Sequence, residues 1–308
     1  MVQVTGEGAN GATGRLFCYG LGYSALALAR RLRTEGWSVA GTTRSPDKAR
    51  RLAAEGIAVF LFDRDRPLED PVAALAGTSH ILSSAPPDGD SRLGGGDPVL
   101  DHHRADIAAL EGLAWLGYLS TTGVYGDRGG GWVDEDSELA PTGERGRRRL
   151  AAEEGWLDLW EREGLPVHLF RLAGIYGPGR NALETVRRGK ARRLDKPGQV
   201  FSRIHLDDIA AVLRASIARP RPGAAYNLCD DEAAPPEEVI AHACQLLGRE
   251  PPPLVPFEEA ELSDMARSFY RDNKRVSNAR IKEELGVALA YPTYREGPKA
   301  LLAEMGET

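Results

Sequence analysis

Residues 16–32 read LFCYGLGYSALALARRL and place the spacing Gly20-x-Gly22-x-x-Ala25 between a short apolar run and an alanine- and leucine-rich helical pattern. A strand that stops at Gly20 and a helix that begins near Ser24 leave backbone N–H groups unpaired at the positive end of the helix, where a pyrophosphate can accept hydrogen bonds. Gly20 permits the tight turn, Gly22 has no Cβ to block the phosphate, and Ala25 lets the helix pack closely on the strand. The segment therefore predicts a dinucleotide-binding site.

A second stretch with the same spacing lies nearer the N-terminus. Residues 6–11, GEGANG, also fit G-x-G-x-x-G, yet no helical periodicity follows them before Gly14, and the strand begins only at Arg15. We interpret residues 1–14 as a flexible leader. Because this leader carries no Lys or Arg and no apolar core, it does not have the pattern of a secretory signal.

Composition and charge exclude several classes of protein. A chain of 308 residues with 42% hydrophobic and 27% charged residues is ordinary for a globular protein. The formal net charge of −6 gives no reason to expect nucleic acid, and no uninterrupted apolar stretch reaches the roughly 20 residues that cross a membrane. Cys18, Cys229 and Cys244 lack C-x-x-C spacing, and the histidines lack metal spacing, so we expect neither a disulfide framework nor a metal site. This cysteine usage predicts a reducing, cytoplasmic location.

Between residues 15 and 178 the chain alternates short apolar runs with helical patterns. After the strand that ends at Gly20, strands are expected at residues 37–41, 57–62, 80–84, 116–120 and 167–172, and helices at 24–35, 45–55, 72–76, 99–113 and 144–163. Such alternation is typical of parallel strands joined by right-handed crossovers, with helices on both faces of the sheet. We therefore expect an α/β fold with a Rossmann-type, doubly wound parallel sheet, which forms an NAD(P)-binding domain over residues 15–178.

The pattern loosens after Pro178. Residues 187–197 and 251–256 are rich in arginine or proline, which predicts a smaller α/β lobe for the substrate over residues 179–308. This lobe is expected to be interleaved with the first domain, because residues 224–228 can return to the sheet as another strand.

The residues at the end of the second strand indicate whether the cofactor is NAD or NADP, and here residues 41–45 are GTTRS. An acid at this position would bond the ribose of NAD, whereas an arginine would meet the extra phosphate of NADP. No acid is present, and Thr43 with Arg44 suits a phosphate, so NADP is expected rather than NAD. The alternative is that Arg44 is a solvated residue before a helix. Asp63, after the third strand, can bond the adenine amine or cap the next turn. The other residues placed in the cofactor site are Tyr23, Ser24 and Ser84.

Three later segments carry a family resemblance. Residues 119–126 (LSTTGVYG), 171–179 (RLAGIYGPG) and 203–208 (RIHLDD) resemble the extended short-chain dehydrogenase/reductase family, the NAD(P)-dependent epimerases and dehydratases. The resemblance covers roughly residues 15–300. Residues 226–228 (YNL) and 291–297 (YPTYREG) look like its atypical branch of predicted nucleoside-diphosphate-sugar epimerases. The resemblance implies an oxidoreductase or epimerase/dehydratase that acts on a nucleotide sugar or another anionic small molecule. It also implies a homodimer, paired through the helices that begin near residues 99 and 144.

Thr121 matches the family's catalytic Ser or Thr, which hydrogen-bonds the substrate hydroxyl or carbonyl. The carboxyl end of a strand is where open parallel sheets place reacting groups. The alternative is that Thr121 and Thr122 satisfy backbone groups of the loop.

The family's Tyr-x-x-x-Lys pair is absent. Where a sequence such as P-x-x-x-Y-G-R-S-K-L-A-A-E is expected, residues 141–153 read PTGERGRRRLAAE, with Arg145 at the tyrosine position and Arg149 at the lysine position. A guanidinium stays protonated at working pH, so it cannot shuttle a proton as a phenol does.

What the substitution keeps is geometry and charge. Residues four apart share a helix face, so Arg145 and Arg149 are both expected to face the cleft. Arg149 can bond the nicotinamide ribose, and Arg145 can clamp a carboxylate or phosphate of the substrate. The alternative is a solvated basic run at a helix start, where cations oppose the helix dipole.

Three other residues are candidates to replace the missing tyrosine. Tyr125 and Tyr176 follow the two strand ends nearest the nicotinamide, and His205 comes from the junction of the lobes. We place Tyr125 with Thr121 as a catalytic candidate, and Tyr176 and His205 with Arg145 in substrate binding. The resemblance also allows the tyrosines to be structural and His205 to orient the loop at residues 207–208. Two functions stay open: an NADP-dependent enzyme, or a binding module that senses NADP or a ligand without turnover.

Overall fold

The computed structural model describes residues 13–88 and 96–306. The G-x-G-x-x-G stretch at residues 6–11 and most of the expected leader lie outside the described residues. In the part of the chain that the structure describes, no helix is long and apolar enough to cross a membrane.

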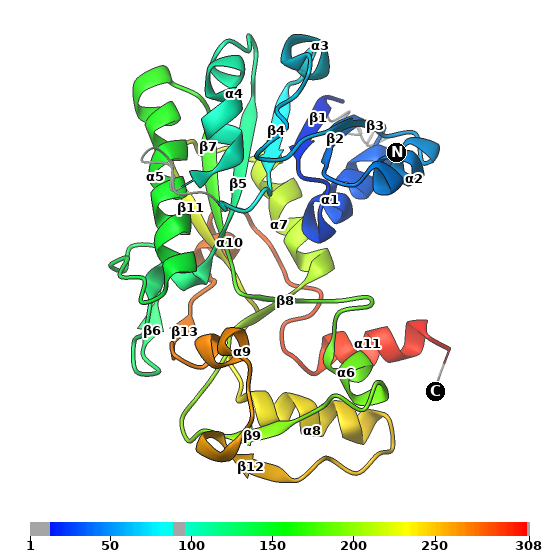
Figure 1. Cartoon of the computed structure of the whole chain (residues 1–308), viewed down its shortest axis with the longest axis vertical. Helices are drawn as coiled ribbons and strands as arrows, with labels where there is room; N and C mark the ends of the chain where they lie inside the picture. Colours follow the sequence, from blue (N-terminus) through cyan, green and yellow to red (C-terminus); the bar gives the residue numbers. More distant parts are fainter. Residues whose placement is uncertain (1–12, 89–95, 307–308) are drawn as a thin grey trace, which may run out of the picture.

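The core of the molecule is a seven-stranded sheet with the order β11-β7-β5-β4-β1-β2-β3 (Figure 1). Every neighbouring pair in it is parallel. Its strands are β1 (Arg15–Tyr19), β2 (Ser38–Thr43), β3 (Ala58–Leu61), β4 (His80–Ser83), β5 (Trp115–Thr121), β7 (Val167–Leu172) and β11 (Ala225–Leu228). The chain moves outward from β1 to β3 and then returns to β4 on the other side of β1. This confirms the doubly wound Rossmann-type sheet and places a topological switch point between β1 and β4.

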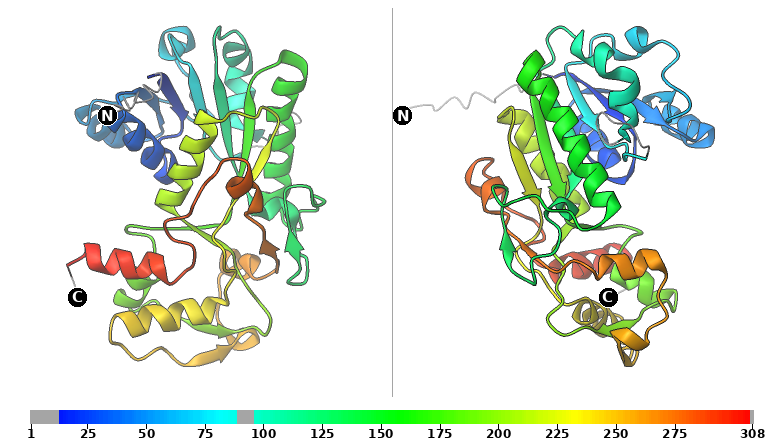
Figure 2. Two further views of the ribbon diagram at one scale, coloured as in Figure 1. Left: turned by 180° about the vertical axis from the view of Figure 1, so that it is seen from behind. Right: turned by 60° about the vertical axis from the view of Figure 1, so that its left-hand side comes forward.

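Helices cover both faces of the sheet because the side chains of each strand alternate between two apolar clusters. In β1, Leu16 and Cys18 face one cluster, whereas Phe17 and Tyr19 face the other. The first face carries α1 (Tyr23–Thr34), α2 (Pro46–Ala54), α7 (Leu206–Ala218) and α10 (Ala279–Glu283), and the second carries α3 (Pro71–Leu75), α4 (Pro98–Ala108) and α5 (Glu144–Glu163). Figure 2 shows α1 and α7 side by side on the first face.

The smaller C-terminal lobe lies at the carboxyl end of the sheet (Figure 1). Its helices are α6 (Ala182–Arg187), α8 (Pro236–Leu246), η3 (Phe257–Glu259), α9 (Asp264–Phe269) and α11 (Glu296–Glu304). Three short parallel pairs join β8 (Gly174–Tyr176) to β10 (Arg203–His205), β9 (Arg193–Asp195) to β12 (Leu254–Pro256), and β6 (Trp132–Val133) to β13 (Arg275–Val276). Leu183, Val186, Ala243 and Leu301 form part of its separate core.

Segments of the chain pass more than once between the sheet and the smaller lobe. The expected strand at residues 224–228 is β11, which pairs with β7 at the edge of the large sheet. The chain also crosses at two other places. Strand β8 comes before the expected boundary at residue 178 but lies in the smaller lobe, and helix α7 comes after that boundary but packs on the large sheet. Segments from both halves of the chain therefore meet where the sheet ends.

An ion pair lies in the core directly behind the end of β5. Arg171 Nη2 lies 2.8 Å from Glu153 Oε2, and the two side chains are 6% and 1% exposed. Arg171 Nη1 also donates to the Tyr125 hydroxyl at 3.0 Å, and this hydroxyl donates to Asn227 Oδ1 at 2.8 Å. Ser120 donates to Glu153. The network thus joins β5, α5, β7 and β11 beneath the loop that follows Thr121.

Candidate functional site

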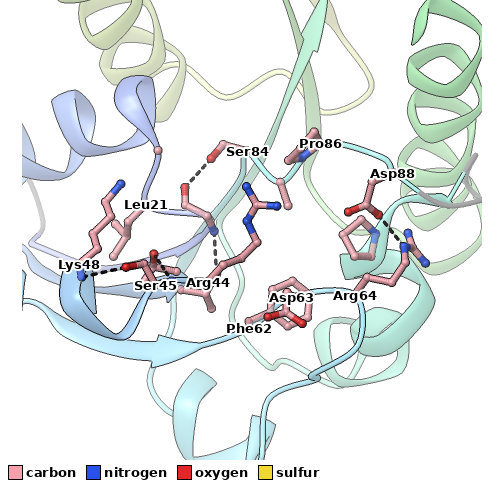
Figure 3. Close-up of a pocket in the computed structure, with 16 residues that line it drawn as sticks. Leu21, Arg44, Ser45, Lys48, Phe62, Asp63, Arg64, Ser84, Pro86 and Asp88 are labelled. Carbon is pink, nitrogen blue, oxygen red and sulfur yellow. Dashed lines mark hydrogen bonds and ion pairs between the residues drawn. The ribbon is translucent and has the colours of Figure 1, made fainter. Parts of the chain in front are cut away.

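A cavity of about 340 Å³ lies at the switch point between β1 and β4 (Figure 3). The strands β1, β2, β3 and β4 all end at it, so residues far apart in the sequence converge there. The predicted cofactor residues that line it are Gly20, Gly22, Thr43, Arg44, Asp63 and Ser84.

The turn from β1 into α1 leaves open space for a phosphate. Gly20 has φ +90°, and its N–H donates to Thr42 Oγ1 at 2.8 Å while Ser84 donates to its carbonyl. Gly22 is the N-cap of α1 and no side chain caps this helix end. Apart from the adjoining chain, a Cβ at Gly22 would meet only Ser84 Oγ, at 3.8 Å, and Gly22 lines the cavity. This arrangement fits a pyrophosphate held by backbone N–H groups.

Three residues predicted to bind the cofactor turn their side chains elsewhere. The Tyr23 hydroxyl donates to the Pro178 carbonyl at 2.9 Å, which ties the start of α1 to the loop after β8. Ser24 and Ala25 are buried in the packing of α1. Their side chains therefore hold α1 in place, as expected of Ala25, and do not line the cavity, so a role of these residues in cofactor binding stays a prediction that rests on their backbone N–H groups.

The end of β2 gives the cavity a positive side. The Arg44 guanidinium points into the cavity (Figure 3). Ser45 caps α2 by accepting a hydrogen bond from the Lys48 N–H at 3.3 Å. Burial, followed by the nearby cations of α1 and α2, lowers the pKa of Lys48, whose side chain also lines the cavity. Asp63 lies on the opposite wall and is paired with Arg66 at 2.7 Å. Two cations thus flank the point where β2 ends.

A larger cleft of about 690 Å³ lies at the end of β5, against the C-terminal lobe. Among the described residues that line it, the charged ones are Arg149, Arg180, Arg203, Lys274 and Asp272. The cations outnumber the single carboxylate, so the cleft favours an anionic ligand.

Thr121, the last residue of β5, lines this cleft. Its Oγ1 accepts a hydrogen bond from the Gly123 N–H at 3.1 Å and so caps η2 (Thr122–Tyr125). The hydroxyl therefore accepts a hydrogen bond from a backbone N–H of the loop, which is the structural role given as the alternative. Thr121 also lines the cleft, which is the position that a catalytic role requires.

The structure separates the two arginines of α5. Arg149 lines the cleft and donates to the Leu119 carbonyl, whereas Arg145 is exposed to solvent and is not among the lining residues. Gly146 is the residue that faces inward in the first turn, because a Cβ there would lie 2.8 Å from the Gly123 carbonyl oxygen. The expected anion clamp of Arg145 with Arg149 is therefore wrong. Close packing against Gly123 turns Arg145 toward water.

Two further predicted site residues belong to the core. Tyr125 is fully buried, and burial raises the pKa of its hydroxyl to about 12. His205 is 1% exposed and caps α7 by accepting a hydrogen bond from the Asp207 N–H at 3.2 Å. Neither lines the cleft, so neither is placed to touch a ligand there. Tyr176 does line the cleft, and its hydroxyl lies 3.5 Å from the Thr293 carbonyl.

The described residues contain no group of three or more His, Cys, Asp or Glu side chains that could hold a metal ion. The three cysteines are buried free thiols. The chemistry of the site is thus built from hydroxyls, cations and backbone groups.

The profile of the NAD dependent epimerase/dehydratase family matches residues 20–229, which contain both the turn at Gly20 and the loop after β5. The chain belongs to this family. The resemblance drawn from the sequence motifs is thereby confirmed, and the family supports a nicotinamide dinucleotide as the cofactor.

Similar proteins range widely in their sequence identity to this epimerase/dehydratase family member. Protein YeeZ of Escherichia coli is 28% identical over 279 residues, which are 89% of this chain and 94% of that protein. A functionally unknown conserved protein from Silicibacter pomeroyi DSS shares 52% identity, with a TM-score of 0.86 over 95% of this chain and 99% of that chain. UDP-glucuronic acid 4-epimerase from Bacillus cereus, solved with UDP-glucuronic acid and NAD, is 14% identical, with a TM-score of 0.75 over 94% of this chain and 99% of that chain. This last likeness shows the fold alone.

Sequence reasoning missed several residues of both cavities. These are Lys48 beside Arg44, and Arg180, Arg203 and Lys274 in the cleft. Lys48 lies four residues after Arg44, Arg180 directly follows the motif at residues 171–179, and Arg203 begins the motif at residues 203–208, so their positions carried a usable signal. Lys274 lies in an irregular segment before β13, where no periodicity indicates which side chains face the cleft.

Proposed function

We propose that the protein is an NADP-dependent oxidoreductase or epimerase/dehydratase that acts on an anionic small molecule of the nucleotide-sugar class. The observation that carries this proposal is the juxtaposition of Thr121 with a cation-rich cleft at the strand next to the cofactor cavity. A nicotinamide dinucleotide in that cavity would supply or accept a hydride. An epimerase of the same fold was solved with UDP-glucuronic acid, so we take this compound as the probe of the ligand class.

Each part of the cleft has a separate task in this proposal. The Thr121 hydroxyl, at the carboxyl end of β5, hydrogen-bonds the reacting hydroxyl or carbonyl of the substrate. Arg180 and Arg203 hold the anionic part of the ligand by charge-assisted hydrogen bonds. Arg149 holds the end of β5 through the Leu119 carbonyl and presents its remaining donors to the cleft.

A second candidate function is a binding module that senses NADP or an anionic ligand without turnover. The arginines at positions 145 and 149 favour it, because neither can take the part of the family's tyrosine in proton transfer. Incubation of the full chain with NADP⁺ and UDP-glucuronic acid, followed by chromatography of the sugar nucleotide, separates the candidates. Conversion supports the enzyme, and binding of both compounds in calorimetry without conversion supports the sensor. Failure of both compounds to bind would contradict both candidates.

We expect the unaltered protein to bind NADPH more tightly than NADH. Arg44 and Lys48 flank the end of β2, where the family fold places the adenosine ribose, and no acid lies at that strand end to bond a free ribose. A charge-assisted hydrogen bond contributes about 1.5–3 kcal/mol, so Arg44→Asp should weaken NADPH binding by roughly 10- to 100-fold and reverse the order of the two cofactors. Fluorescence titration measures both affinities.

The matched control is Arg50→Asp, which makes the same charge change on α2 at a side chain that is paired with Asp47 and lies away from the cavity. It should leave the preference unchanged. Tighter binding of NADH than of NADPH by the unaltered protein would contradict the assignment of NADP.

A further inference from the structure

Lys274 is a nearly buried amine in the wall of the cleft. Its side chain is 10% exposed, and its Nζ donates to the Gly126 carbonyl at 2.8 Å and lies 3.5 Å from Asp272 Oδ2. Both Lys274 and Asp272 line the cleft together with Thr121. The ammonium group has three donors, so two hydrogen bonds leave it able to make a third.

The contacts of Lys274 tie it to segments that adjoin the position of the missing tyrosine. Gly126 directly follows η2, the short helix that begins after Thr121. Asp272 accepts a hydrogen bond from Thr142, three residues before Arg145 on the chain. The amine thus contacts the loop after β5 directly and the segment just before α5 through Asp272, and these segments adjoin Thr121 and the family's tyrosine position at Arg145.

The other titratable groups near this point are less suited to exchange a proton with a ligand. Tyr176 and Asp272 also line the cleft, but burial and nearby carboxylates raise the pKa of the Tyr176 hydroxyl, and Asp272 already accepts hydrogen bonds from Thr142 and Lys274. A guanidinium such as that of Arg149 stays protonated. The Tyr125 hydroxyl is buried and already bonded to Arg171 and Asn227. A lysine amine, by contrast, can act as a general base or acid once its surroundings bring it within reach of neutrality.

We propose that Lys274 is the proton-transfer residue of this cleft, in place of the family's tyrosine. The inference rests on the proposed function. In the oxidation direction the neutral amine takes the proton of the substrate hydroxyl and becomes an ammonium, while the C–H bond breaks and its electron pair leaves with the hydrogen as hydride to the oxidised nicotinamide. In the reduction direction the ammonium returns that proton to the carbonyl oxygen as hydride arrives from the reduced nicotinamide. The Thr121 hydroxyl orients the same oxygen in both directions.

The surroundings of Lys274 shift its pKa in both directions. Burial lowers the pKa of Lys274, whereas Asp272 and Asp127 raise it and Arg128 lowers it further. Burial is the largest of these effects, so the net direction is downward. The neutral amine is therefore more accessible than that of an exposed lysine. The neutral amine keeps two N–H donors, enough for the Gly126 carbonyl and Asp272, and its lone pair is then available to accept a proton.

Competitive trace labelling with acetic anhydride tests the proposal on the full chain without cofactor. Only neutral amines react, so the labelling rate of each lysine, followed by mass spectrometry across a pH series, has its midpoint at the pKa of that lysine. We expect the midpoint of Lys274 to lie below that of Lys299, which is exposed on α11. A midpoint equal to or above that of Lys299 would overturn the proposal.

Two further measurements are the protection of Lys274 from labelling by bound ligands and the activity of a Lys274 variant. NADPH with UDP-glucuronic acid as the probe should slow the labelling of Lys274 but not that of Lys299. Lys274→Arg keeps the charge but cannot deprotonate, so it should retain NADPH binding while conversion of UDP-glucuronic acid falls about 10²- to 10⁴-fold. Lys282→Arg, at a lysine paired with Asp231 outside the cleft, should leave both unchanged.

The outcomes separate the two hypotheses. Unchanged conversion in Lys274→Arg would overturn the role of Lys274 and leave the proposed function standing. Absence of NADPH binding in the unaltered protein would overturn the proposed function, whatever the labelling midpoint. If NADPH binds and UDP-glucuronic acid is not converted, a lowered midpoint with protection supports the role of Lys274, and an unshifted midpoint contradicts it.

Discussion

Replacing Arg171 with methionine should lower the free energy of unfolding by about 3–5 kcal/mol, because removal of one partner leaves the other charge of a buried pair uncompensated. The Glu153 carboxylate is 1% exposed and would lose its guanidinium partner, with Ser120 left as a donor to it. The Tyr125 hydroxyl would lose its donor at the same time. Urea denaturation followed by circular dichroism measures the change.

Two comparisons make the result specific to the buried pair. Arg50→Met breaks an ion pair whose side chains are 76% and 79% exposed, so it should change the free energy of unfolding by less than about 1 kcal/mol. The double variant Glu153→Gln with Arg171→Met removes both charges and should be more stable than Arg171→Met alone. Equal losses in the buried and exposed variants would show that the Arg171 pair does not hold β5, β7 and α5 together.

Gly22→Val should abolish the binding of both NADPH and NADH with little effect on the fold. The new Cβ would meet only Ser84 Oγ, at 3.8 Å, and the backbone at Gly22 has φ −77°, which valine adopts without strain. The added atoms would instead occupy the space in front of α1 that a pyrophosphate needs. We expect affinity for both cofactors to fall by about 100-fold or more, which corresponds to roughly 2.7 kcal/mol. Calorimetry measures the binding.

Gly143→Val is the matched control for this variant. Gly143 is also an N-cap in extended conformation without a side-chain cap, and a Cβ there would meet nothing within 4 Å. Both variants should therefore lose the same small amount of stability, since valine is a poorer N-cap than glycine. Cofactor binding by Gly22→Val at the affinity of Gly143→Val would show that the pyrophosphate lies elsewhere.

The fold was largely predictable because its elements are long or strongly patterned. The helix expected at residues 144–163 has those bounds in the structure, where Gly164 ends it in the left-handed conformation. The helix expected at residues 99–113 ends at Ala108. Leu110 and Leu113 pack on the same core from the turn that follows, so the apolar periodicity continues after the helix has stopped.

The candidate site was less predictable than the fold. The glycines at the end of β1 and Arg44 at the end of β2 lie in the cavity because strand ends of a parallel sheet converge. The four-residue spacing on α5 predicted that Arg145 and Arg149 share a helix face. It did not predict that Gly146 packs closely against Gly123, and this packing decides which side chains of α5 face the cleft. Lys274 comes from an irregular segment that is placed by long-range hydrogen bonds, such as that of Arg128 to the Asn273 carbonyl at 3.0 Å. No local pattern encodes such contacts.

The position of β11 at the edge of the sheet has a consequence for biosynthesis. Its neighbour β7, VHLFRL, is buried throughout in the finished protein. Because chains leave the ribosome N-terminus first, β7 emerges before the strand that covers it, and its apolar edge stays open until residues 225–228 follow. An open, hydrophobic strand edge is a template for pairing with other chains. A nascent chain stalled between β7 and β11 would therefore be a natural target for chaperones, although the four strands that end at the switch-point cavity are already complete.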